Sequence, residues 1–474
     1  MSLSPPWSYL LKLFHASRMR AAVLSNALPA RYYPQKGFLS VGFSFAGDYK
    51  MMERNTPLVF LVWLVWLNGC FLFEVDGLRA QGKFKQIQRR KSSKPNLLEL
   101  PLRSASSLGA AQYFVTMRIG TPPKEFRMSV STCSVLTWIK CSNCSSGKVS
   151  SDMRFYQPNK SRTFRTIPCS SSFCTSDLIS SNANEVCPTR DAPCRYDYRH
   201  KDGTRLVGTI GNDTITIRMK GNRKVILENI TIGCTEAKNL QIDYPLDGLL
   251  GLCPERQSFA GKALRQTRTT SFSYCLVDSS SPINVSSYLV FGGSKQLPNM
   301  QETDLLMGPW SWSIYYHLNV SGISLDGKML HIPSDMWLYN PNGRSGGVIL
   351  DIGTSLTVLA APVYDNLIQG LLPSISKFEK VKTEENGDLE HCFNSTGFNE
   401  TLVPKLTIHF GNGAKFEPPV KNYVIGQDIK CLGFMKFDEL QTSIIGNLLQ
   451  QNHFWEFDFP NYKLKFAPSI CISD

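Results

Sequence analysis

Two short stretches of the chain carry the residue types of one acid–base site. The first is Ser131–Ser134 (Ser-Thr-Cys-Ser), the second is Asp351–Thr354 (Asp-Ile-Gly-Thr), and Asp351 follows Ser131 by 220 positions. A carboxylate can take a proton from water near neutral or acid pH, whereas a serine hydroxyl can only hold that water by hydrogen bonds. These residues therefore offer one group that could act as a base, Asp351, beside a hydroxyl that could not.

The elements that must position these stretches are strands. From about residue 112 onward, short runs rich in Val, Ile, Tyr and Phe alternate with Gly, Pro and Asn turns. That alternation is typical of a mostly β protein. We expect strands at Tyr113–Ile119, Thr214–Ile217, Tyr315–Val320 and Leu406–Phe410.

The two halves of the chain repeat one pattern. In each half a strand-like run precedes the polar stretch, and a hydrophobic pair with a glycine follows later, at Leu249–Gly251 and at Ile444–Gly446. The two halves of the chain are therefore internally similar.

The motifs that surround these stretches resemble those of a known family. In order along the chain they are AQYFVTMRIGTPPKEF, LTWIKC, CRYDYRHKDGT, DGLLGL, FSYCLVD, YLVFGG, GGVILDIGTSLT, KCLGF and SIIGNLLQQNHFWEFDF. Nearly the whole chain from Gln112 onward is similar to the plant, nepenthesin-like branch of the pepsin-like aspartic proteases. The resemblance implies a mostly β, bilobal pepsin-like acid protease fold with a ψ-shaped loop in each lobe, a central cleft, and acid endopeptidase activity on polypeptides.

The site departs from the family pattern at four positions. The family has Asp-Thr/Ser-Gly in both stretches, so Ser131 replaces one catalytic aspartate and Cys133 replaces a glycine. Ile352 stands where a Thr or Ser hydroxyl would bond across the lobes, and His200 stands at the expected position of the flap tyrosine. Two carboxylates that share one proton are the basis of the family's chemistry. We therefore expect weak or absent hydrolysis.

The resemblance assigns roles to eight residues. Asp351 is the catalytic acid, and Ser131 marks the position of the missing one. The residues expected to bind substrate or support the site are Thr132, Ser134, Trp138, His200, Gly353 and Thr354.

Two other interpretations of the site stay open. Asp351 could be purely structural, bonded to neighbouring loop N–H groups. Ser131, His200 and Asp351 could also form a serine-histidine-acid set, although nothing in the sequence indicates an oxyanion hole and a histidine on a flap is poorly fixed as a base.

Three functions follow from these alternatives. The first is an aspartic-type endopeptidase with an incomplete pair of acids. The second is a non-catalytic binding protein or an inhibitor of a glycoside hydrolase, as the xylanase-inhibitor relatives of the family are. The third is a lightly constrained gene product. The partner in the first two is a polypeptide substrate or a protein ligand, and we expect a monomer without a cofactor or metal.

Cysteines and glycosylation motifs indicate an oxidising compartment. The chain has 14 cysteines and eight N-x-S/T sequons, which together are typical of secreted proteins. A zinc site at Cys141-x-x-Cys144 or Cys169-x₄-Cys174 is disfavoured, because the resemblance places these cysteines in a disulfide-closed insertion. Cys133 and Cys253 are extra to the family, and they either bridge to each other or remain two buried thiols.

The net charge of +13 is concentrated at the start of the chain. Residues 1–100 contain 14 Lys or Arg against 5 Asp or Glu, which leaves 37 against 33 for the rest. The globular part is therefore close to neutral, and it has no basic motif interleaved with aromatic residues. Nucleic-acid binding is not expected.

The start of the chain is predicted to be a leader. The apolar run at 57–73 follows a short charged region, as in a secretory signal peptide, and it contacts a membrane only if it stays uncleaved. Residues 1–50 are either transit-like or upstream sequence wrongly joined to a start at Met51 or Met52. We expect secretion to the apoplast or cell wall, with plastid or vacuole as the alternative.

The chain is thus predicted to have five segments. They are an N-terminal extension at 1–50, a signal peptide or signal anchor at 51–76, a basic pro-segment or linker at 77–110, an N-terminal pepsin-like lobe with the cysteine-rich insertion at 111–300, and a C-terminal pepsin-like lobe at 301–474.

Overall fold

The computed structural model describes most of the chain from residue 97 onward. The described ranges are 97–141, 154–178, 183–199, 205–219, 223–236, 246–307, 315–340, 345–382, 389–438 and 441–472. The predicted leader, with the apolar run at 57–73, lies outside them. In these ranges no helix is long and apolar enough to cross a membrane. The predicted segment boundaries on the leader and between the lobes stay predictions.

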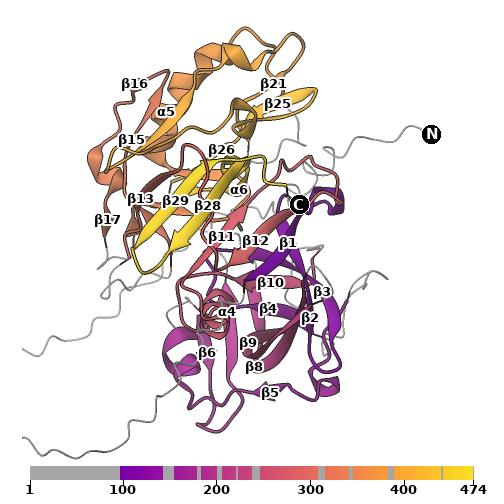
Figure 1. The fold of residues 1–474 in the computed structure, drawn as a ribbon. Helices are drawn as coiled ribbons and strands as arrows, with labels where there is room; N and C mark the ends of the chain where they lie inside the picture. The colour runs from indigo at the N-terminus through magenta and orange to yellow at the C-terminus, as the bar shows by residue number, and fades with distance from the viewer. Residues whose placement is uncertain are drawn as a thin grey trace, which may run out of the picture. The chain divides into compact units, whose positions relative to one another are not determined.

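Strands dominate the fold (Figure 1). Within the described ranges, fifteen of them form one sheet, in which β5 (Arg165–Thr166) pairs with β8 beside the main order. That order is β13 (Gln301–Asp304), β29 (Lys463–Pro468), β28 (His453–Asp458), β11 (Ser271–Cys275), β12 (Ser287–Phe291), β1 (Leu98–Ser104), β2 (Tyr113–Ile119), β3 (Lys124–Ser131), β10 (Gly248–Gly251), β4 (Trp138–Cys141), β9 (Lys224–Glu236), β8 (Arg205–Arg218), β7 (Arg195–Arg199) and β6 (Ala183–Val186).

Four smaller sheets lie in the second half of the described chain. In sheet order they are β14 (His317–Leu318), β19 (Val348–Leu350), β27 (Ser443–Ile445), β20 (Thr357–Ala360) and β26 (Phe434–Phe437); β16 (Lys328–Met329), β15 (Val320–Leu325), β22 (Leu406–Phe410) and β23 (Lys415–Phe416); β21 (Cys392–Asn394), β25 (Ile429–Leu432) and β24 (Val424–Gly426); and the pair β17 (Tyr339–Asn340) and β18 (Ser345–Gly346).

Helices are few and short in the described part of the chain. The α-helices are α4 (Phe259–Thr267), α5 (Ala361–Ile375) and α6 (Asn447–Gln450). Single turns of other helix types occur at η1 (Ser106–Leu108), η2 (Pro158–Lys160), η3 (Phe173–Asp177), η6 (Ser334–Trp337), η8 (Glu400–Leu402) and η9 (Val420–Asn422). The predicted mostly β, pepsin-like fold is confirmed.

The large sheet joins the two halves. Strands β28 and β29 come from the end of the chain, yet β28 pairs antiparallel with β11 of the first half, as Figure 1 shows. Across this seam the Phe272 and Phe457 rings stack with centroids 4.6 Å apart, and the Cys275–Cys471 disulfide closes it. The continuous sheet fixes the two halves against each other, so a site built from both can be held rigidly.

A strand lies inside the predicted basic linker. The basic linker was expected to extend through residue 110, but Leu98–Ser104 form β1, which pairs with β12 and β2. Leu98, Leu100 and Leu102 alternate into the core with 0–1% of their surface exposed. Pro101 and Arg103 lie on the exposed face between them. These exposed residues made the stretch look like a linker in composition. Its buried leucines nevertheless recur at every second position, which is the spacing of a strand.

Candidate active site

Each polar stretch begins where a buried strand ends, and the two strands are equivalent. Strand β3 runs parallel to β10, with Ser131 opposite Gly251, and β10 is antiparallel to β4. In the other half β19 runs parallel to β27, with Leu350 opposite Ile445, and β27 is antiparallel to β20. The repeated pattern read from the sequence therefore corresponds to two copies of one three-strand arrangement.

The two stretches meet although 220 residues separate them. Ser131 Oγ donates a hydrogen bond to Asp351 Oδ1 over 3.1 Å. Gly353 lies so close that a Cβ added to it would come within 2.5 Å of Ser131 Cβ. Ser131 is 6% and Asp351 5% exposed. The residue at 131 thus occupies the place from which a second carboxylate would touch Asp351.

Hydrogen-bond donors surround the Asp351 carboxylate. Oδ1 faces the Ser131 and Thr132 hydroxyls, each 3.1 Å away, and the N–H groups of Thr132, Cys133 and Gly353 at 3.0, 3.2 and 3.0 Å. Oδ2 accepts from Thr354 Oγ1 over 2.7 Å. These contacts, which come from both stretches, hold the carboxylate in one orientation.

Thr132 links the two halves. Its Oγ1 donates to the carbonyl oxygen of Leu350 over 2.8 Å and accepts from the N–H of Ile352 over 3.2 Å. The Ile352 side chain is fully buried in the core and offers no hydroxyl in return. Of the two hydroxyls that the family motif would place here, only that of Thr132 is present to bond between the halves.

The remaining predicted site residues lie near this centre or outside the described ranges. Ser134 Oγ donates to the Leu136 carbonyl over 2.9 Å and so fixes its own turn. Trp138 is buried at the start of β4. His200 lies outside the described residues, so its proposed roles on the flap and in a serine-histidine-acid set stay predictions.

Cys133 and Cys253 are not disulfide-bonded, so the bridge considered between them is absent from the described structure. Their backbones are nonetheless close, because the N–H of Cys253 donates to the carbonyl of Ser134 over 3.2 Å. Burial raises the pKa of the Cys133 thiol well above its usual value, and the Asp351 and Cys253 charges act in the same direction. A thiol held protonated is a poor nucleophile. Cys133 therefore adds bulk rather than reactivity beside the carboxylate.

Tyr315, near the site, and Tyr198, which interacts with it, were not predicted from the sequence. Burial raises the pKa of Tyr315, and its electrostatic neighbours are Cys133, Tyr198, Asp351 and Cys253. Tyr198 and Tyr315 also pack against the same buried cluster that contains Cys253. Tyr198 lies in the CRYDYRHKDGT motif, two residues before His200, and was therefore an available alternative for the flap tyrosine.

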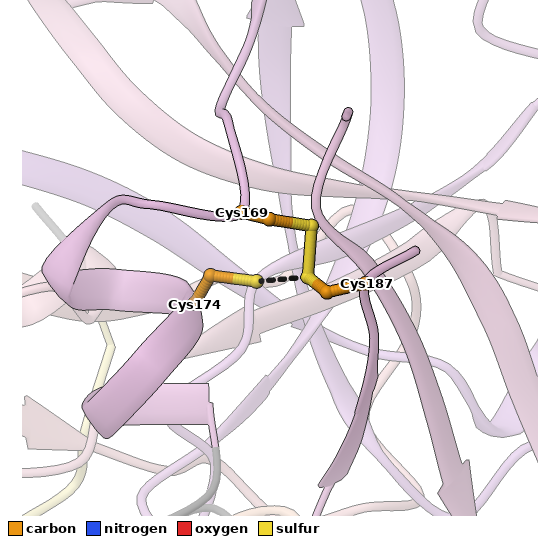
Figure 2. Close-up of side chains that lie close together, drawn as sticks. All are labelled: Cys169, Cys174 and Cys187. Atoms are coloured by element: carbon orange, nitrogen blue, oxygen red, sulfur yellow. Dashed lines mark hydrogen bonds between the residues drawn. A yellow bond between two sulfur atoms is a disulfide. The ribbon is translucent and has the colours of Figure 1, made fainter. Parts of the chain in front are cut away.

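A cluster of sulfur atoms lies in the cysteine-rich insertion. The Sγ atoms of Cys169, Cys174 and Cys187 are within 4.8 Å of one another, and Figure 2 shows Cys169 bonded to Cys187 with Cys174 beside them. Cys174 bonds to Cys194. Sulfurs paired in disulfides are not thiolate ligands, so the described geometry is that of two adjacent bridges.

The other disulfides are Cys141–Cys234 and Cys392–Cys431, besides Cys275–Cys471 at the seam. Ten of the 14 cysteines are thus paired. Besides Cys133 and Cys253, the remaining two, Cys70 and Cys144, lie outside the described residues.

Two hollows lie in the second half, away from Asp351. One is an apolar cavity of about 20 Å³ lined by core residues of β15, α5 and β27. The other is a groove of about 680 Å³ lined by residues 405, 417–421, 423, 452, 453 and 468–470. Neither includes a predicted site residue. The central cleft stays an expectation of the resemblance, since residues 200–204 lie outside the described part.

Comparison with known proteins decides the family. The domain descriptions "Xylanase inhibitor N-terminal" and "Xylanase inhibitor C-terminal" match residues 113–293 and 315–468. Aspartyl protease family protein 2 of Arabidopsis thaliana is 32% identical over 371 residues, covering 78% of this chain and 73% of that protein. The chain belongs to the plant, nepenthesin-like branch of the pepsin-like aspartic protease family. Aspartic proteinase nepenthesin-1 of Nepenthes gracilis is 28% identical over 84% of this chain and 89% of its own.

Solved structures show the same fold at lower identity. The structure described as edgp is 18% identical, with a TM-score of 0.62 over 80% of this nepenthesin-like chain and 96% of its own. Conglutin gamma, a basic 7S globulin from lupine seeds, is also 18% identical, with a TM-score of 0.60 over 79% and 95%. At this identity the likeness supports the fold alone.

Proposed function

We propose that this protein is an aspartic-type endopeptidase homologue that binds polypeptide and hydrolyses it weakly or not at all. The observation that carries the proposal is the 3.1 Å hydrogen bond from Ser131 Oγ to Asp351 Oδ1. A hydroxyl donor stands where the family mechanism needs a second titratable acid.

The chemical argument concerns the proton that the two acids would share. With two carboxylates in contact, one stays protonated and polarises the scissile carbonyl while the other takes a proton from water. Ser131 cannot donate a proton at that acidity, because its hydroxyl does not ionise in this pH range. Losing one positioned acid–base group costs about 10²- to 10⁴-fold in rate, and more when the two act as a unit.

Inhibition of a glycoside hydrolase is a second candidate. It is favoured by the match of both halves to the domains described as xylanase inhibitor, which together span residues 113–293 and 315–468. In that case surface loops would hold the partner protein and the site around Asp351 would need no chemistry. Titration of the purified chain into bacterial and fungal xylanases tests it, and unchanged xylanase rates at excess protein would exclude it.

A secretory route accompanies either function. Five disulfides within the described ranges form and persist in oxidising compartments. We place the mature protein outside the cell, in the apoplast or cell wall.

The decisive experiment restores the missing acid. The full chain, its Ser131→Asp/Cys133→Gly variant and its Asp351→Asn variant are secreted and incubated with a denatured protein substrate between pH 3 and 6. We expect the restored variant to cut at least about 10²-fold faster than the natural chain and Asp351→Asn to show no activity.

Other outcomes have defined meanings. Cleavage by the natural chain at the restored variant's rate, abolished by Asp351→Asn, would overturn the proposal in favour of a single-carboxylate protease. Circular dichroism of all three proteins checks that each is folded, so that a silent variant reflects lost chemistry.

A further inference from the structure

The eight N-x-S/T sequons are not structurally equivalent. Asn143 lies outside the described residues. The side chains of five others are exposed, namely Asn159, Asn229, Asn284, Asn394 and Asn399. Two more, Asn212 and Asn319, are half-buried. Since a glycan needs its amide nitrogen at the surface, the fold separates these sequons into two classes.

Asn394 and Asn399 present their amides in a form suited to modification. Asn394 ends β21, and its Oδ1 accepts from the N–H and the hydroxyl of Thr396 at 3.0 and 2.7 Å. Asn399 caps η8, with its Oδ1 accepting from the N–H of Thr401 over 3.0 Å. In both cases the side-chain carbonyl oxygen already accepts a hydrogen bond from the threonine of the same sequon. The Nδ2 atom, which would carry the sugar, donates to no other described residue.

In Asn319, by contrast, the amide nitrogen is the atom that makes contacts. Its Nδ2 donates to Asp304 Oδ2 over 3.5 Å, and a Cβ on Gly411 would lie only 2.7 Å from that nitrogen. The atom that would bond to a sugar therefore faces a carboxylate and the neighbouring backbone. A glycan there would have to displace both.

Asn212 lies inside the large sheet. It pairs with Arg165 of β5 on one side and with Thr231 of β9 on the other, and its Oδ1 accepts from Thr231 Oγ1 over 3.0 Å. Thr231 is also the hydroxyl residue of the Asn229 sequon, but Asn229 itself is exposed at a positive φ of 53°. The sequons of Asn212 and Asn229 lie on paired strands and thus differ in the exposure of their asparagine, which is half-buried at 212 and exposed at 229.

We propose that the folded protein carries N-linked glycans at Asn159, Asn229, Asn284, Asn394 and Asn399, and that Asn212 and Asn319 stay unmodified. The inference rests on the secretory route proposed above. The donor class is a lipid-linked oligosaccharide diphosphate. A bond forms between Nδ2 and the anomeric carbon, the carbon–oxygen bond to diphosphate breaks, Nδ2 loses one proton, and the lipid diphosphate leaves.

Timing explains why burial in the folded state matters. Sugars are added to a chain that is still unfolded, when all eight sequons are accessible. A molecule modified at Asn319 could not form the contacts with Asp304 and Gly411. One modified at Asn212 would have to fit a sugar beside a half-buried side chain between β5 and β9. The folded, secreted population is therefore expected to lack sugars at these two positions.

The test is site-by-site mapping of the full chain secreted from plant cells with its own leader. Peptides are treated with peptide N-glycosidase A in H₂¹⁸O, which converts each glycosylated asparagine to labelled aspartate. We expect label at the five exposed sites in most molecules and none at Asn212 or Asn319. Thr396→Ala should remove one glycan from the intact mass, whereas the matched variant Thr214→Ala, in the Asn212 sequon, should remove none.

Every other outcome counts against the inference. Label at Asn212 or Asn319 in folded protein would overturn the burial argument, and absence of label at Asn394 and Asn399 beside label elsewhere would overturn the assignment of the paired sites. A secreted chain with no label at all would contradict the proposal while leaving its secretory premise intact, whereas a chain retained in the cytosol would contradict the premise itself. None of these results depends on proteolysis, because the hydrogen bonds of Asp351 involve none of the five asparagines.

Discussion

At the scale of single residues, the site is a complete hydrogen-bond shell around an incomplete pair of acids. Asp351 retains the donors that would hold a catalytic carboxylate, including Thr354 Oγ1 at 2.7 Å. The hydroxyl of Ser131 fills the remaining place. An Asp351 held this way serves the structure of the two loops equally well, which is why the rate of the restored variant, and not the geometry of Asp351, separates the two roles.

Gly353 allows the two loops to approach each other. A Cβ at this position would lie 2.5 Å from Ser131 Cβ and 3.0 Å from Ser131 Cα. We expect Gly353→Ala to lower the free energy of unfolding by about 1–3 kcal/mol, the usual cost of overpacking, as measured by urea denaturation. Gly433→Ala is the matched control, because its Cβ would meet only ordinary contacts at 3.4 Å and beyond. Equal stability of the two variants would contradict the close-approach argument.

At the scale of elements, two strand arrangements of the same kind aim two loops at one point. The parallel pairs β3–β10 and β19–β27 lead directly into the stretches that hold Ser131 and Asp351. A main-chain hydrogen bond extends each pairing beyond the strands, from Leu252 N–H to Ser131 O and from Asp351 N–H to Ile445 O. The strand ends, rather than the loops themselves, therefore set the position of Ser131 and Asp351.

The two adjacent disulfides near β7 are predicted to exchange. Cys174 Sγ lies 3.5 Å from Cys187 Sγ (Figure 2). In Cys194→Ser the freed Cys174 thiolate should attack Cys187, forming a Cys174–Cys187 bond and releasing Cys169 as the leaving thiolate. Acid quenching, alkylation and peptide mapping should then find label on Cys169 as well as on Cys174.

The control for this exchange is Cys392→Ser. It frees Cys431, whose bridge has no second disulfide among the contacts of the described residues, so only Cys431 should be labelled. If Cys194→Ser labels Cys174 alone, the two bridges are chemically independent despite their contact.

At the scale of the whole molecule, a buried histidine makes folding sensitive to acid. His317 in β14 is 2% exposed, and its ring stacks on Tyr339 with centroids 3.8 Å apart. Burial lowers its pKa from 6.5 to about 4. Between these two values the unfolded chain binds a proton that the folded chain does not, so this group's contribution to stability is lost as the pH falls from about 6.5 to about 4.

The size of this effect can be measured by difference. A shift of this size corresponds to about 3 kcal/mol. We expect the free energy of unfolding of His317→Gln to fall by about 3 kcal/mol less than that of the natural chain between pH 7 and pH 4, by urea denaturation. His331→Gln, at an exposed position, should follow the natural chain. Parallel curves for all three proteins would show that His317 is not protonated on unfolding.

Because one sheet runs through both halves, a loss of stability in one half should affect the other. Because β28 pairs with β11 and the Cys275–Cys471 bridge spans 196 residues, the halves are expected to unfold together rather than in sequence. Loss of stability at His317 should therefore reach Ser131 and Asp351, which depend on both halves being in place.

The sequence by itself determined the β class, the duplicated plan and the presence of serine at the position where the family motif has an acid. These features are local: strands at Tyr113–Ile119 and Leu406–Phe410 follow from composition and period and match β2 and β22. The replacement at Ser131 needs only a motif with a known chemical requirement. The strand at Leu98–Ser104 was missed because its exposed face is polar and its partners, β2 and β12, are distant in sequence.

Only the tertiary structure decided what touches what. The 3.1 Å contact between Ser131 and Asp351, the lack of a disulfide between the neighbouring Cys133 and Cys253, the approach of Tyr315 to the site and the packing of Asn319 against Gly411 all involve residues far apart along the chain. Such contacts depend on the register and twist of every strand between them, since a shift of one residue reverses which face a side chain occupies. Local sequence patterns do not specify the register and twist of all these strands, so the contacts within the site could be determined only from the tertiary structure.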